Sequence, residues 1–221
     1  MQLLLIRHGE SQGNVESRLQ GRADFPLSDL GVGQAGALAD KLASSGIDAL
    51  YSSPLLRAKM TADAVAGAAG LDVVEDDRLQ EYDVGEISGM TWPEVKERYP
   101  EIARQYREES EFPRFPGSES RDDFSARVQA SINEIVVRHK DDGKVAVVTH
   151  GGPILVYVME SLGTPYSRPP RFRVDDTSIH TIEFSERAGF PERTIVGLND
   201  ISHLRSLDRV TADASSEEAE E

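Results

Sequence analysis

Residues 2–9, QLLLIRHG, join a short apolar run to the triplet Arg-His-Gly. Residues 144–152, KVAVVTHGG, follow the same pattern, with an apolar run that leads into His-Gly-Gly. Nearly uninterrupted runs of Leu, Ile, Val and Ala of this length are typical of strands covered on both faces by other elements. We therefore expect 2–7 and 144–149 to be central parallel strands of one sheet.

The rest of the chain alternates between helical and strand-like segments. Helices are expected at 28–45, 54–69, 122–139 and, after Gly152, in the segment HGGPILVYVMESLG, which Gly163 closes; strands are expected at 49–52, 71–75, 177–184 and 193–198. Ser53-Pro54 has the residue types of an N-cap and a first helical position, and Thr91 with Glu94 has capping-box spacing. This alternation predicts an α/β fold: a three-layer α/β/α sandwich around a mostly parallel sheet.

The chain has 221 residues, enough for one domain with a substantial core, which we expect to span 1–207. Residues 90–117 are rich in charge and interrupted by prolines, so we expect a lid insertion of short helical pieces over the site. The final residues, 208–221, have the acidic composition of a disordered tail. Nothing in the sequence indicates the oligomeric state.

The composition excludes several classes of function. A formal net charge of −15 opposes binding to nucleic acid or an anionic membrane, so an anionic substrate needs a locally basic pocket. No stretch approaches the roughly 20 apolar residues of a membrane span, and no signal peptide is evident, so we expect a cytoplasmic protein without membrane partners. The chain has no Cys, which excludes disulfides, thiolate metal ligands and cysteine nucleophiles.

A histidine follows each of the two expected central strands. In an open α/β sheet the ligand crevice lies beyond the carboxyl ends of the strands, so His8 and His150 can face one bound group. The neighbouring glycines, Gly151 among them, let the backbone approach that group closely. The helix expected after Gly152 offers unpaired N–H donors that suit an anion. A phosphoryl group fits this arrangement.

Arginine is the best side chain for neutralising phosphoryl oxygens, because its planar fork binds two oxygens at once. Arg7 lies beside His8, and Arg57 is expected in the first turn of a helix that follows another strand. Phosphoryl transfer depends mainly on such positioning and charge neutralisation around an in-line nucleophile. These two arginines are therefore candidate phosphate ligands.

The departing alcohol also needs a proton, which a carboxyl group near the crevice can supply. Glu81, in the loop LQEYDVGEISG, is the best-placed candidate. Glu10, Asp83 and Glu86 are close in sequence and compete for this role. The alternative of a zinc site at the two histidines lacks an evident third ligand. The other histidines, His139, His180 and His203, have the contexts of structural residues.

Six segments, in order along the chain, resemble the histidine phosphatase superfamily, which includes the phosphoglycerate mutases. They are LIRHGESQGN (5–14), LQGRADFPLSDLGVGQA (19–35), YSSPLLRAKMTA (51–62), LQEYDVGEISG (79–89), FPGSES (115–120) and VVTHGG (147–152). A single Arg-His-Gly would be weak evidence, but so many ordered matches are specific. The resemblance points to the phosphatase branch and to the phosphoglycerate mutase-like fold.

The resemblance implies a role for each matched residue. His8 would become phosphorylated, with Arg7, Arg57 and His150 completing the phosphate pocket. Glu81 would donate the proton and later activate water. The resemblance adds further substrate contacts at Asn14, Gln20 and Gly21. It also implies that no metal and no cofactor are needed.

Three functions follow, in decreasing order of support. The first is hydrolysis of a small phosphorylated metabolite through a phosphohistidine. The second is a cofactor-dependent phosphoglycerate mutase, which resembles the first but carries tandem arginines in its lid. Here the lid cations are scattered, with no adjacent arginines: Lys96, Arg98, Arg104, Arg107 and Arg114. The third is an inactive module that binds phosphorylated ligands, which is disfavoured because every expected polar residue is present.

Overall fold

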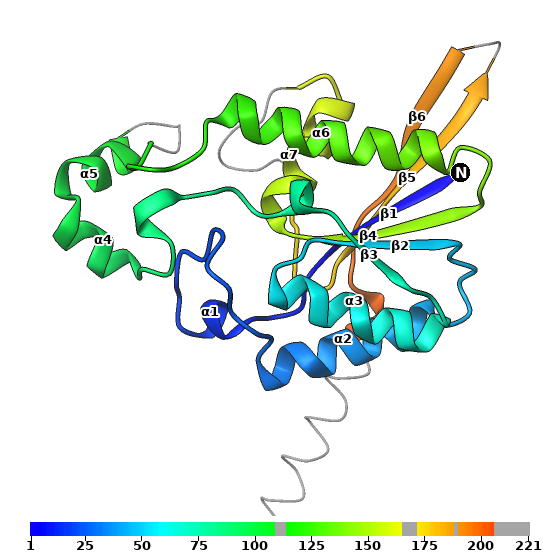
Figure 1. Ribbon diagram of the computed structural model, residues 1–221, viewed down its shortest axis with the longest axis horizontal. Helices are drawn as coiled ribbons and strands as arrows, with labels where there is room; N and C mark the ends of the chain where they lie inside the picture. Colours follow the sequence, from blue (N-terminus) through cyan, green and yellow to red (C-terminus); the bar gives the residue numbers. More distant parts are fainter. Residues whose placement is uncertain (109–113, 165–171, 188–189, 206–221) are drawn as a thin grey trace, which may run out of the picture.

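The computed structural model describes residues 1–108, 114–164, 172–187 and 190–205. Their fold is a three-layer α/β/α sandwich, as predicted (Figure 1). The sheet order is β3-β2-β4-β1-β5-β6. The strands are β1 (Gln2–Arg7), β2 (Ala49–Ser52), β3 (Val73–Glu75), β4 (Lys144–Thr149), β5 (Ile179–Arg187) and β6 (Phe190–Asp200). Strands β1 to β4 pair in parallel, whereas β5 and β6 run antiparallel at one edge.

The helices form the two outer layers, with α2 and α3 on one face of the sheet and α6 and α7 on the other (Figure 1). Their bounds are α1 (Gln12–Val15), α2 (Asp29–Leu42), α3 (Leu56–Ala69), α4 (Trp92–Arg98), α5 (Pro100–Glu108), α6 (Arg121–Arg138) and α7 (Gly151–Ser161). Short 3-10 turns are found at Asp77–Leu79, Gly85–Ile87 and Ser202–Leu204. Gly163, after α7, has a positive φ of 67°, in keeping with the predicted helix stop.

The central strands are buried on both faces, which explains their continuous apolar sequences. Leu3 and Leu5 of β1 belong to the core shared with α6 and α7. Leu4 and Ile6 belong to the core shared with α2 and α3. Successive side chains of a strand point to opposite faces, so one apolar run supplies both cores. The polar residues that follow β1 and β4 therefore lie at the carboxyl ends of two central, buried strands.

The start of α3 differs from the prediction. Leu55, not Ser53, is the N-cap, and the helix begins at Leu56. Asp24 Oδ1 accepts a hydrogen bond from Leu56 N at 2.6 Å, so a carboxylate distant in sequence caps this helix. The interpretation of Ser53-Pro54 as the helix start is wrong, and the Ser53 hydroxyl has a different partner, described below.

Residues in and around 90–117 form helices α4 and α5, and the capping box of Thr91 and Glu94 is present. Their apolar residues pack in a small core with Val95 and Phe115 at its centre. The role of this segment as a lid, and the single-domain span 1–207, stay predictions. The acidic tail at 208–221 lies outside the described residues.

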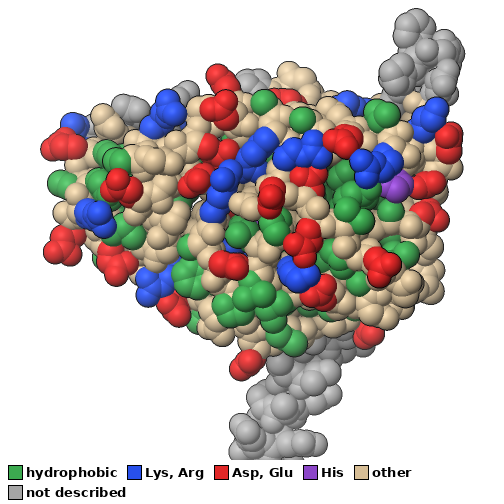
Figure 2. Space-filling model, in the orientation of Figure 1, with side chains coloured by type: hydrophobic (Ala, Val, Ile, Leu, Met, Phe, Trp, Pro, Cys, Tyr) green, Lys and Arg blue, Asp and Glu red, His purple; other side chains and the backbone are tan. Residues whose placement is uncertain are grey.

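Across the face seen in Figure 2, acidic and basic side chains are interspersed. None of the helices described has the length and apolar character that crossing a membrane requires.

Candidate active site

His8 and His150 lie side by side because β1 and β4 are neighbours in register, with Arg7 opposite Thr149. His8 N donates to Thr149 O at 3.0 Å and fixes the relative height of the two strand ends. The two imidazole rings are edge to face, with centroids 5.1 Å apart. Both residues are buried, with 3% and 0% of their surfaces exposed. The predicted pairing of the two histidines is present.

The His8 ring is oriented by its own loop. Nδ1 lies 2.7 Å from Gly9 O, and because a carbonyl only accepts, Nδ1 carries the proton. Nε2 is then left with a free lone pair. Burial, together with the charges of Arg7 and Arg57, lowers the pKa of His8 well below its ordinary value of 6.5. A neutral imidazole with an unprotonated Nε2 is the form that a nucleophile requires.

The His150 ring is oriented by Ser53, whose Oγ lies 2.8 Å from Nε2. Ser53 Oγ also accepts from Leu55 N at 3.3 Å, and we infer that its own proton is donated to Nε2. In that tautomer Nδ1 carries the hydrogen; this atom is buried and has no hydrogen-bond partner among the described residues. Burial and the charge of Arg57 lower the pKa of His150 well below 6.5. In the inferred tautomer the ring is a neutral donor.

Two guanidinium groups face this pair. Arg7 donates from Nη1 to Val174 O at 2.6 Å, and its Nη2 lies 3.0 Å from Asp176 Oδ1. Arg57 is 1% exposed and has no carboxylate in direct contact among the described residues. It donates instead to the carbonyls of Gly21 and Ala23, at 2.8 and 2.9 Å. Burial lowers the pKa of Arg57 to about 10, so an anion here would relieve an unfavourable buried charge.

Glu81 lies at the mouth of the same pocket. Oε1 accepts from Tyr82 N at 2.8 Å and Oε2 from Gly152 N at 3.1 Å. The competing acids have other partners. Glu10 accepts from Ser28 Oγ, Asp83 caps Gly85 N, and Glu86 accepts from Tyr99 at the surface. Among these carboxylates, only Glu81 lines the cavity described below.

Arg127, on α6, holds the Glu81 loop and was not identified from the sequence. Its guanidinium donates to the carbonyls of Arg78, Gln80 and Glu81, at 2.7 to 2.8 Å. It also forms a close ion pair with Glu119. Nothing in the local sequence separates Arg127 from an ordinary helix-surface arginine, because its contacts depend on how α6 packs on this loop.

Of the remaining predicted substrate residues, Gln20, Gly21 and Gly151 line the same cavity, and Asn14 is linked to Gln20 through the Ser11 hydroxyl. Asn14 Oδ1 accepts from Ser11 N at 3.0 Å. The Ser11 hydroxyl lies 2.7 Å from both Asn14 Oδ1 and Gln20 Oε1, and its one proton is donated to either of them. Gly21, with φ of 49°, and Gly151, the first residue of α7, line the cavity.

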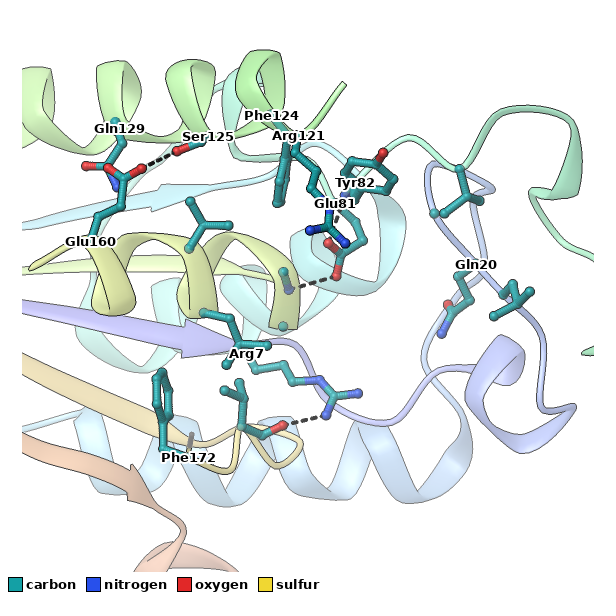
Figure 3. A pocket seen from close by; sticks show the side chains of 18 of the residues that line it. Arg7, Gln20, Glu81, Tyr82, Arg121, Phe124, Ser125, Gln129, Glu160 and Phe172 are labelled. Carbon is teal, nitrogen blue, oxygen red and sulfur yellow. Dashed lines mark hydrogen bonds between the residues drawn. The ribbon is translucent and has the colours of Figure 1, made fainter. Parts of the chain in front are cut away.

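A cavity of about 1300 Å³ opens from this site (Figure 3). At the reacting end it is lined by Arg7, Gln20, Gly21, Glu81, Gly151 and Gly152. Figure 3 shows Arg121, the first residue of α6, close to Glu81. Arg121 is a further candidate contact that the sequence did not single out. None of the described residues of 90–117 lines this cavity.

The other histidines have structural partners. His139 contacts Tyr51 and Asp142, His180 contacts Ser178, and His203 contacts Thr177. No cluster of three or more His, Asp or Glu able to hold a metal occurs in the part of the chain that the structure describes.

Comparison with known proteins identifies close relatives. Phosphoserine phosphatase 1 of Hydrogenobacter thermophilus is 38% identical, over 92% of this chain and 94% of that protein. A probable phosphoglycerate mutase of Salmonella paratyphi B is 33% identical, over 92% and 95%. Among solved structures, a mycobacterial glucosyl-3-phosphoglycerate phosphatase matches with a TM-score of 0.77 and 30% identity, over 90% and 98%. The alpha-ribazole phosphatase of Shigella flexneri matches with a TM-score of 0.81 and 27% identity, over 91% and 97%.

The sequence model of the histidine phosphatase superfamily (branch 1) matches residues 3–199 of this chain. This match covers nearly the whole described fold, from β1 into β6, and confirms the resemblance drawn from the six sequence segments. The chain belongs to the histidine phosphatase superfamily, branch 1.

Proposed function

We propose that this protein is a phosphomonoester hydrolase that acts on a small phosphorylated metabolite through phospho-His8. The observation that carries the proposal is the arrangement of a neutral His8 beside His150 and the buried Arg57, whose guanidinium donates to backbone carbonyls and forms no ion pair with the described residues. The names of the relatives support the reaction class, since several are phosphatases of small phosphorylated metabolites. A further structure of the mycobacterial glucosyl-3-phosphoglycerate phosphatase was determined with inorganic phosphate.

The reaction takes place in two steps. His8 Nε2 attacks phosphorus with its lone pair while the bond from phosphorus to the alcohol oxygen breaks, and Glu81 gives that oxygen a proton. Arg7, Arg57 and the N–H of His150 neutralise the equatorial oxygens. Water then attacks phospho-His8, Glu81 takes its proton, and the N–P bond breaks to release phosphate.

Mutase activity is the second candidate, because one relative is named a probable phosphoglycerate mutase. A mutase must hold a carboxylated intermediate with two phosphoryl groups. Arg98 and Arg104 instead form surface ion pairs with Glu86 and Glu101. This supports transfer to water as the main reaction.

The decisive experiment compares the native protein with His8→Ala on p-nitrophenyl phosphate in EDTA, with rapid quenching. We expect a burst of nitrophenol equal to the enzyme concentration and an acid-labile phosphoryl group on His8. The variant should show neither. Turnover that persists in His8→Ala would overturn the assignment of the nucleophile.

A second experiment separates hydrolase from mutase. With 3-phosphoglycerate and 2,3-bisphosphoglycerate, hydrolysis predicts free phosphate as the main product, and mutase activity predicts 2-phosphoglycerate. The net charge of −15 further supports a small metabolite, and not nucleic acid or a membrane, as the partner. The cytoplasm stays the predicted location.

A further inference from the structure

The cavity extends far beyond the space that a phosphoryl group needs. It runs along α6 and α7, and both helices begin beside Glu81, with Arg121 and Gly152 close to that carboxylate. Gln129 and Glu160 lie together at the opposite end (Figure 3). Glu160 lies eight positions after Gly152 in α7, which corresponds to a helical rise of about 12 Å. The cavity therefore has two ends, at a separation that the helices fix.

The wall between the two ends is apolar. It is formed by Phe124 and Ala126 of α6, Leu155 and Val156 of α7, and Phe172 and Val174 from the segment before β5. Gly152, Leu155 and Val156 lie on one face of α7, because residues three and four apart in a helix are neighbours. A three-carbon alcohol such as serine or glycerate would cover only the first part of this wall.

The far end is polar. Gln129 Nε2 is buried and has no hydrogen-bond partner among the described residues. Ser125 Oγ donates to Glu160 Oε1 at 2.5 Å beside it. A buried donor left unpaired costs free energy, so this amide is suited to an acceptor supplied by a ligand.

We propose that the cavity binds the leaving group of the substrate, and that this group is an alcohol with an extended apolar body ending in a hydrogen-bond acceptor. With the phosphoryl group at His8, the apolar body lies against Leu155 and the acceptor meets Gln129 Nε2. The cavity is continuous with the reacting end, so the occupant is part of the substrate. This inference rests on the proposed phosphatase function and specifies its substrate class.

The first test uses n-alkyl monophosphates from ethyl to octyl, whose leaving alcohols have nearly the same acidity. We expect kcat/KM to rise about two- to fourfold for each added methylene, the effect of burying one CH2 group. The value of kcat should change little, because the alkyl group of the substrate binds equally well in the ground state and in the transition state. A flat or falling series with intact ethyl phosphate turnover would overturn the inference. No turnover of any ester would instead overturn the proposed phosphatase function.

The second test asks where in the cavity the alkyl group of the substrate binds. Leu155→Asn should lower the ratio of octyl to ethyl kcat/KM at least tenfold. Val137→Asn is the matched control, because Val137 is on α6, 71% exposed and outside the cavity, and its ratio should equal that of the native protein. Thermal unfolding checks that both variants fold. If either variant does not fold, the alkyl series on the native protein still tests the inference. An unchanged ratio in a folded Leu155→Asn would refute this placement.

The third test concerns the polar end. The native protein should prefer 8-phosphooxyoctanamide to octyl phosphate, because the amide carbonyl can accept from Gln129 Nε2. Gln129→Leu should reverse that preference. If the native protein favours octyl phosphate, or if the variant keeps the native order, the acceptor is not recognised by Gln129.

Discussion

The rings of His8 and His150 meet edge to face, with their planes inclined at 62°. Each ring has one nitrogen held by the protein: His8 Nδ1 by Gly9 O, and His150 Nε2 by Ser53 Oγ. With the Ser53 hydroxyl donating to His150, the two remaining nitrogens are complementary, because His8 presents a lone pair and His150 an N–H. In the proposed reaction the lone pair of His8 attacks phosphorus and the N–H of His150 binds a phosphoryl oxygen.

Ser53 is expected to control the His150 tautomer. Ser53→Ala should lower kcat/KM about tenfold, the loss that corresponds to one hydrogen bond of roughly 1.4 kcal/mol, and weaken vanadate inhibition similarly. Nitrogen NMR should show the His150 proton shared between Nδ1 and Nε2. Ser52→Ala is the control, because Ser52 Oγ donates to a backbone carbonyl and does not touch His150. Native kinetics in Ser53→Ala would show that the serine has no such role.

Arg57 should make folding stability sensitive to phosphate. A ligand that binds only the folded state at 100 times its Kd adds about 2.7 kcal/mol to the free energy of unfolding. Arg57 offers a buried charge whose pKa burial has lowered to about 10, so inorganic phosphate should bind there. Arg57→Met should abolish the phosphate-induced rise in Tm, whereas Arg138→Met, at a surface ion pair, should keep it. An equal rise in both variants would place phosphate elsewhere.

Buried histidines should make the fold sensitive to mild acid. Burial lowers the pKa of His8 and His150 well below 6.5, and that of His180 and His203 to about 4. As pH falls below 6.5 the unfolded chain takes up protons that the folded chain does not, so stability decreases. Each histidine contributes a slope of up to about 1.4 kcal/mol per pH unit.

Urea unfolding between pH 7.5 and 5 measures this effect and avoids most carboxylate titration. His203→Gln should reduce the slope by the equivalent of one proton at most, because the unfolded variant has one fewer group to protonate. Stability that stays constant, or rises, from pH 6.5 to 5 would contradict the lowered histidine pKa values.

The central sheet and much of the site follow from local sequence. The limits of β1, β2 and β4 agree with the apolar runs, because burial on both faces requires a continuous pattern. The pairing of His8 and His150 follows because the carboxyl ends of two neighbouring parallel strands lie side by side. No knowledge of side-chain contacts is needed to predict it.

Long-range contacts explain what the sequence did not indicate. Ser53 has the residue type of an N-cap, but its hydroxyl meets His150, 97 residues away, and Asp24 caps α3 in its place. Arg127 supports Glu81 through backbone carbonyls, which carry no sequence signal. Such partners are determined by the packing of the layers.

Gly152 gives the sharpest test of Glu81 as the proton donor. A Cβ at Gly152 would lie 2.1 Å from Glu81 Oε1, so Gly152→Ala must displace the carboxyl, although a helical Ala does not weaken α7. We expect kcat/KM for ethyl phosphate to fall about 10²-fold or more, but only slightly for p-nitrophenyl phosphate, whose nitrophenolate leaves without a proton. A Cβ at Gly151 would meet nothing within 4 Å, so Gly151→Ala is the matched comparison. This variant should lower kcat/KM for the two esters by the same factor. If Gly152→Ala also lowered kcat/KM for the two esters by the same factor, displacement of Glu81 would not affect proton transfer. Another acid would then have to protonate the alcohol.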